Sequence, residues 1–208
     1  MPSQNVFHWR DGRGWLIFSG GWDDDILALA LTRDVTDGGV ACVSLSGDPD
    51  ALLDDISDLG APSSFIVDLF GEDDQSLQEK LSQAGMIIIT GGASPQDARS
   101  ALQGVALEAI DAAYQNGAII LLEDMSAMAF GAWIIGEEIE QGLGWLEGAV
   151  LTGVNNAATY AIPVFETQPS AIAVAIMSGS ALALGPDGQI ESWGRREVTI
   201  ALGPTYVA

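Results

Sequence analysis

The chain has 208 residues and a formal net charge of −22 at pH 7, because 29 acidic residues are balanced by only seven lysines and arginines. Hydrophobic residues make up 48% of the sequence and charged residues 17%, a globular composition that excludes a disordered chain. A surface this acidic repels phosphate backbones and anionic lipids, so we expect neither nucleic acid nor a membrane as a partner.

Size and cysteine content set further expectations. We expect one domain over residues 1–208, with residues 1–14 as an N-terminal arm. The amino terminus has no secretory pattern and no apolar run spans a bilayer, which predicts a cytoplasmic protein. The single cysteine, Cys42, lies in an apolar run and is interpreted as a buried small hydrophobe. The acidity fits a solubilising surface; a cationic substrate or partner is the alternative.

Apolar runs typical of strands alternate with amphipathic runs typical of helices from residue 15 to about residue 135. The predicted strands are 14–20, 40–47, 65–71, 86–92 and 118–122. The predicted helices are 23–35, 48–60, 73–85, 94–116 and 127–135. Continuous apolar strands separated by capped helices indicate a parallel sheet covered on both faces.

This alternation predicts an α/β fold of three αβα layers, doubly wound around a mostly parallel sheet of flavodoxin-like type. Beyond residue 148 the pattern changes. Residues 148–154 and 171–177 could each add a strand, and 181–202 reads as an antiparallel hairpin turned by Gly-Pro-Asp-Gly at 185–188.

The segment LLEDMSAMAFGA, residues 121–132, predicts a turn between the fifth strand and the next helix. Serine hydrolases expose their nucleophile at such a turn, within a G-x-S-x-G pattern. With Ser126 as the serine, the two glycine positions hold Asp124 and Met128. Bulky residues there oppose a tight elbow, because strand and helix backbones crowd around it.

Ligands of open α/β sheets bind beyond the carboxyl ends of the strands. Glycine pairs occur there after the first strand, at Gly20 and Gly21, and after the fourth, at Gly91 and Gly92. Such pairs can present backbone N–H groups to an oxyanion, although plain turns use them as often. We therefore expect a pocket formed by these loops and Asp124.

Acidic residues near this edge have two interpretations. Glu123 and Asp124 favour a helix amino terminus, and Asp23, Asp24 and Asp25 are typical of a helix cap. Alternatively, these carboxylates act on a bound water or hold a hard ion such as magnesium or calcium. We expect no metal and no cofactor.

Five segments in this order resemble the cyanophycinase and aspartyl dipeptidase family of serine peptidases, which has a class I glutamine amidotransferase-like fold. They are GWLIFSGGWDD, IIITGGASPQ, the SAxA core at 126–129, GLGWLEGAVL at 142–151 and AIAVAIMSGSALALGPDGQIES. The similarity runs from about residue 15 to residue 202. It implies the same fold for nearly the whole chain.

The resemblance implies roles for individual residues. Ser126 falls on the family's nucleophile, with Ala127 beside it in the oxyanion region. Gly91 and Gly92 fall on the oxyanion and substrate loop, and Gln96 is a displaced counterpart of that loop's glutamine.

The family's catalytic histidine should follow GAVL, where this chain has Thr-Gly-Val-Asn-Asn at 152–156. Asn155 or Tyr160 could occupy the space, but neither is an established base for a serine at neutral pH. The only histidine, His8, precedes the first strand and could reach the site only through a folded-back or exchanged arm. A serine without a base is a poor nucleophile.

We therefore interpret the chain as a degenerate, inactive homologue of these peptidases, kept as a subunit or as a binder of a small molecule or peptide. The alternative is an active hydrolase of peptide or acyl bonds that uses Ser126 with a non-histidine base. The chain also has many tryptophans for its size: Trp9, Trp15, Trp22, Trp133, Trp145 and Trp193. Some should line a subunit contact, which predicts a homodimer.

Overall fold

The computed structural model describes residues 6–33, 37–61, 63–195 and 197–207. Its larger sheet has seven strands in the order β11-β10-β1-β5-β4-β2-β3. The strands are β1 Leu16–Ser19, β2 Val40–Ser44, β3 Ser64–Ile66, β4 Met86–Thr90, β5 Ile119–Glu123, β10 Ser180–Gly185 and β11 Gln189–Gly194. The strands β1 to β5 run parallel, and β10 and β11 add an antiparallel edge.

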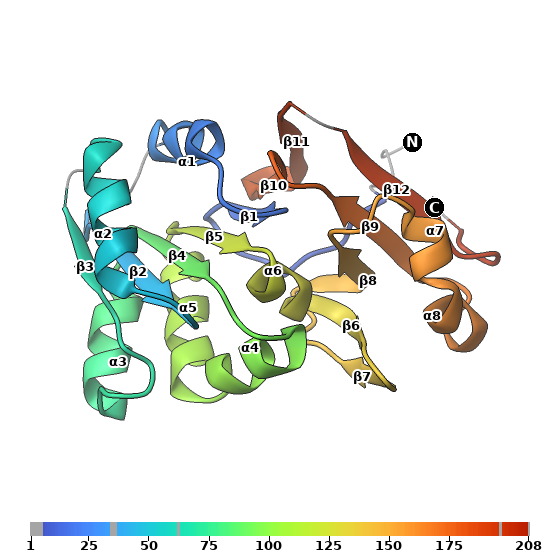
Figure 1. Ribbon diagram of the computed structural model, residues 1–208, viewed down its shortest axis with the longest axis horizontal. Helices are drawn as coiled ribbons and strands as arrows, with labels where there is room; N and C mark the ends of the chain where they lie inside the picture. Colours follow the sequence, from blue (N-terminus) through green and yellow to red (C-terminus); the bar gives the residue numbers. More distant parts are fainter. Residues whose placement is uncertain (1–5, 34–36, 62, 196, 208) are drawn as a thin grey trace.

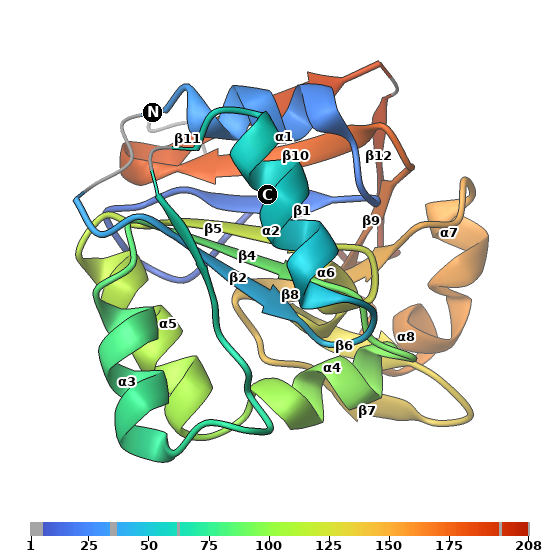
Figure 2. The same cartoon turned by 60° about the vertical axis from the view of Figure 1, so that its left-hand side comes forward.

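Helices cover both faces of this sheet (Figure 1). The helices before the elbow are α1 Asp24–Leu31, α2 Pro49–Asp58, α3 Asp74–Ser82, α4 Pro95–Leu102 and α5 Val105–Gln115. On one side α1 and α2 pack over a core that contains Ile17, Ile88 and Leu121. On the other side α3 and α5 pack over a larger core, and Figure 2 shows the two helix layers from the side of α2. The predicted three-layer α/β fold with a mostly parallel sheet is confirmed.

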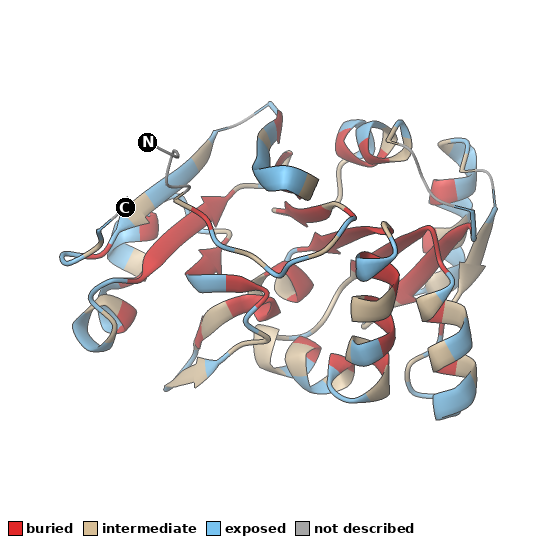
Figure 3. Ribbon diagram, turned by 180° about the vertical axis from the view of Figure 1, so that it is seen from behind, coloured by how far each residue is buried: buried red, intermediate tan, exposed pale blue. Residues whose placement is uncertain are grey.

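The carboxyl-terminal part of the chain builds a second sheet of five strands, in the order β12-β9-β8-β6-β7. Its strands are β6 Gly131–Ile135, β7 Ile139–Gln141, β8 Leu146–Thr152, β9 Ile172–Ile176 and β12 Val198–Leu202. The short helices α6 Met125–Ala129, α7 Ala157–Tyr160 and α8 Ile162–Thr167 belong to this half of the chain. The larger core continues from the first sheet to the second, and Figure 3 shows buried strands beneath helices whose outer sides are exposed.

Three predicted elements need correction. The helix expected over 94–116 is two helices, because Gly104 adopts φ +85 and starts α5 after a break at Gln103. The helix expected through 127–135 ends at Ala129, and Gly131–Ile135 pairs as β6 with β7 and β8. The hairpin expected over 181–202 is β10 and β11, turned at Pro186–Gly188, whereas β12 leaves it and pairs with β9.

Burial agrees with several readings of single residues. Cys42 is fully buried in β2, and burial raises the pKa of its thiol to about 11, so it is an inert core residue. Of the tryptophans, Trp145 and Trp193 are buried and the others are partly buried. None of the helices in the described ranges has the length and apolar character needed to cross a membrane.

Candidate functional site

The strained turn between β5 and α6 lies at Asp124. This residue has φ 49° and ψ −113°, and in the described part of the chain Asp187 is the only other non-glycine residue with positive φ. A strand-to-helix turn with a non-glycine residue in this conformation is the geometry of a nucleophile elbow. The elbow predicted at Ser126 therefore lies two residues earlier in the chain. The residue at its apex carries a carboxylate.

Ser126 is inside the protein. Its side chain is 0% exposed, and its hydroxyl lies 2.8 Å from the carbonyl oxygens of Ile89 and Glu123. The same oxygen accepts a hydrogen bond of 2.9 Å from the backbone N–H of Glu123. Because the hydroxyl fastens α6 to β4 and β5, a substrate cannot reach it. Counted from Asp124, Ser126 occupies the second glycine position of the G-x-S-x-G pattern, where only a small side chain fits.

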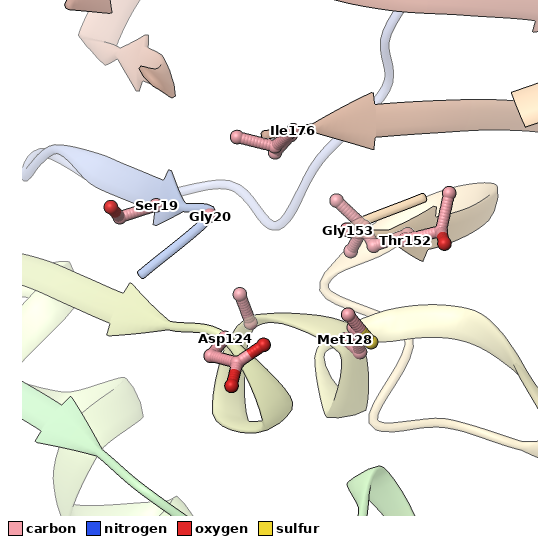
Figure 4. Close-up of a pocket in the computed structure, with 9 residues that line it drawn as sticks. Ser19, Gly20, Asp124, Met128, Thr152, Gly153 and Ile176 are labelled. Carbon is pink, nitrogen blue, oxygen red and sulfur yellow. The ribbon is translucent and has the colours of Figure 1, made fainter. Parts of the chain in front are cut away.

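A narrow pocket opens beside the elbow at the carboxyl ends of β1, β5, β8 and β9 (Figure 4). It is lined by Ser19, Gly20, Asp124, Ala127, Met128, Leu151, Thr152, Gly153 and Ile176. The space that the centre of a water molecule can reach is about 10 Å³, which suffices for roughly one water. The Met128 methyl group lies 3.5 Å from the position that a Cβ on Gly153 would take, so Met128 extends across toward β8.

The loop after β4 lies beside the elbow, as expected. Gly91 and Gly92 have φ values of +81° and +109°, and a Cβ on Gly92 would lie 3.4 Å from the Cβ of Met125. The Gly92 N–H, however, donates to the Ser46 hydroxyl at 2.9 Å. This candidate oxyanion donor is therefore already engaged within the protein.

Three other residues expected at the pocket lie elsewhere. The Gln96 side-chain nitrogen lies 2.5 Å from the position of a Cβ on Gly136, so the amide packs on the turn between β6 and β7. Asn155 is exposed and lines a separate depression. Gly21 faces Ser178 and, unlike Gly20, does not line the pocket. Local sequence spacing could not place these residues, because each position depends on contacts with the second half of the chain.

The two acidic residues at the end of β5 differ in environment. Glu123 is only 4% exposed, and burial, with the neighbouring Asp124 charge, raises the pKa of its carboxyl to about 8. Asp124 is exposed and makes no side-chain cap on α6, so the predicted capping role is not found. The signal missed in the sequence is alternation: Glu123 follows Ile119 and Leu121 on one face of β5, and both face the core.

The aspartates after β1 have structural roles. Asp23 caps α1 by accepting hydrogen bonds from the N–H groups of Asp25 and Ile26. Asp24 accepts from the Trp22 indole, and Asp25 pairs with Arg195. The described residues contain no group of three or more potential metal ligands. These carboxylates are thus engaged in local contacts.

The single histidine lies at the opposite end of the sheet from the pocket. The His8 carbonyl accepts a hydrogen bond from the N–H of Glu147, at the start of β8. The end of β8, Thr152, lines the pocket. Five residues of strand separate these points, about 17 Å. His8 therefore has no contact with the elbow in this chain.

Comparisons with known proteins give a fold-level match. No protein-family model matches the chain, and no curated protein matches its sequence significantly. Among solved structures, a peptidase from an acI-B1 Actinobacterium aligns with a TM-score of 0.72 and 15% identity, covering 92% of this chain and 91% of that protein. A protein assigned as peptidase E from Listeria monocytogenes EGD-e aligns with a TM-score of 0.62 and 14% identity, over 88% of this chain and 99% of that one. The chain therefore has a peptidase-like fold.

Proposed function

We propose that this protein is a non-hydrolytic homologue of the cyanophycinase and aspartyl dipeptidase type of serine peptidase, retained as a binding or subunit protein. The observation that carries the proposal is the exchange at the elbow. The exposed position holds Asp124, and the nearby serine, Ser126, is buried with its hydroxyl bonded to backbone carbonyls.

The surroundings support the same conclusion. Attack by a serine requires a base that accepts the hydroxyl proton, and loss of such a base costs up to about a million-fold in turnover. The pocket has no imidazole among its lining residues. Tyr160 is no substitute, because burial raises the pKa of its phenol, and Thr152 only partly opposes that shift. The pocket also has room for little more than a water molecule.

The alternative is hydrolysis of peptide or acyl bonds by Ser126 with a non-histidine base. It would require α6 to separate from β4 and β5, which would break the hydrogen bonds of the Ser126 hydroxyl. It would also leave the apolar residues of α6, including Ala129, exposed to water. Nothing in the pocket would compensate for that loss.

A fluorophosphonate probe and a substrate panel test the proposal. We expect the parent protein to remain unlabelled and to show no turnover of β-aspartyl-arginine, aspartyl dipeptides or simple esters. The matched control is Ser126→Ala, which should behave like the parent in both assays. Labelling or turnover of the parent that disappears in Ser126→Ala would show that the buried hydroxyl becomes reactive, and would refute the proposal.

A further inference from the structure

The last strand of the second sheet, β12, has one unpaired edge. It pairs antiparallel with β9, from Val198 opposite Ile176 to Leu202 opposite Ile172. Within the described residues no other strand pairs with β12, which ends the sheet order. In Figure 1 it forms the border of the molecule near the carboxyl terminus. An unpaired edge presents a row of backbone N–H and C=O groups that another strand can bind.

The sequence of β12, Val-Thr-Ile-Ala-Leu, has none of the features that protect such an edge. It contains no charged residue and no proline. One face is apolar and open to solvent, with Ile200 41% and Leu202 51% exposed. Figure 3 shows the strand in the colours of intermediate and exposed residues. The other face is covered, because Ala201 packs with the small core beneath α7.

We propose that β12 pairs antiparallel with β12 of a second copy of this chain, about a twofold axis at Ile200. In this register Ile200 lies opposite Ile200 of the second copy, and Val198 lies opposite its Leu202. The apolar side chains of the two strands then lie on one face and cover each other. The two five-stranded sheets become one continuous sheet, and the open edge is removed from solvent.

Charge favours a second copy as the occupant. Each chain carries −22, so a dimer forms only where its contact surfaces are free of charge. β12 is such a surface, and every copy presents it. The nearest acidic residue is Glu197, which the proposed register places opposite Gly203 of the second copy. The two Glu197 residues are then six strand positions apart, about 20 Å. This exceeds the screening length of about 8 Å at physiological salt.

Cysteine cross-linking tests both the partner and the register. Residues directly opposite in an antiparallel pair have Cα atoms about 4.5–5.5 Å apart, which a disulfide can bridge. Ile200→Cys should therefore give a covalent dimer on oxidation with copper phenanthroline. The only native cysteine, Cys42, is fully buried and should not react. The matched control is Ile162→Cys on α8, 50% exposed, which should remain uncross-linked.

Light scattering at micromolar concentration completes the test. The parent should have the mass of a dimer, and Ile200→Lys should have the mass of a monomer with an unchanged circular-dichroism spectrum. A monomeric parent would overturn the proposal. So would a dimer in which Ile200→Cys forms no more cross-link than Ile162→Cys, because the contact would then lie elsewhere.

Discussion

Replacement of Asp124 by glycine should stabilise the fold relative to replacement by alanine. Its φ of 49° and ψ of −113° lie where L side chains are strained, at a cost of about 1–3 kcal/mol. Glycine adopts this conformation freely but loses about 0.5–1 kcal/mol more than alanine in chain entropy. The expected net difference is about 1 kcal/mol in favour of Asp124→Gly.

The comparison with Asp124→Ala isolates the backbone. Both variants remove the carboxylate and its repulsion of Glu123, but only alanine keeps a Cβ at the strained position. Urea unfolding followed by tryptophan fluorescence measures the free energy of unfolding of each, and the expected difference corresponds to about 2–4 °C in melting temperature. An Asp124→Gly variant no more stable than Asp124→Ala would show that the elbow is not strained, and the assignment of the apex to residue 124 would fail.

Two further predictions concern stability. The folded-state pKa of Glu123, about 8, exceeds its ordinary value of 4.5, so its contribution is fully present below pH 4.5 and is lost as pH rises toward 8, with a slope of up to about 1.4 kcal/mol per pH unit. Unfolding titrations should show that Glu123→Gln removes this slope and that the exposed-site control Glu108→Gln retains it; equal slopes in both variants would contradict the assignment. Arg33 stacks 4.4 Å from the Trp15 ring and 5.1 Å from the Trp193 ring, so Arg33→Ala should cost about 1–2 kcal/mol of unfolding free energy and Arg33→Lys less. An Arg33→Ala variant as stable as the parent would mean that this stack contributes nothing.

The larger sheet could be predicted because its parallel strands are buried on both faces. Such strands read as continuous apolar runs, as in β4 and β5, and their order along the chain determines which helices cover which side. The second sheet could not be predicted with the same certainty. β6 follows a run of helix-forming small residues, and only its pairing with β7 and β8 makes it a strand. Tertiary contacts decide such short segments.

The site shows where local pattern reaches its limit. The SAxA match draws attention to Ser126, but two residues separate it from the strained turn. The position of the turn depends on where β5 stops pairing, and Glu123 still pairs with Ser19 of β1. A strand longer by one residue than its apolar run therefore moves the apex to Asp124. Burial of Ser126 and protonation of Glu123 both follow from this placement.

The elbow persists without a serine at its apex because the surrounding bonds enforce it. The Asp124 N–H donates to the carbonyl of Ser19, and its carbonyl accepts from the Met128 N–H, at 3.0 and 3.1 Å. The Ser126 hydroxyl bonds to Ile89 on the neighbouring strand. These contacts hold the turn from both sides whatever side chain it carries, so the fold keeps its backbone strain after the nucleophile is lost. An active-site backbone can thus be retained for structural reasons alone, and the side chains at the apex and in the pocket, not the turn, decide whether it is an enzyme.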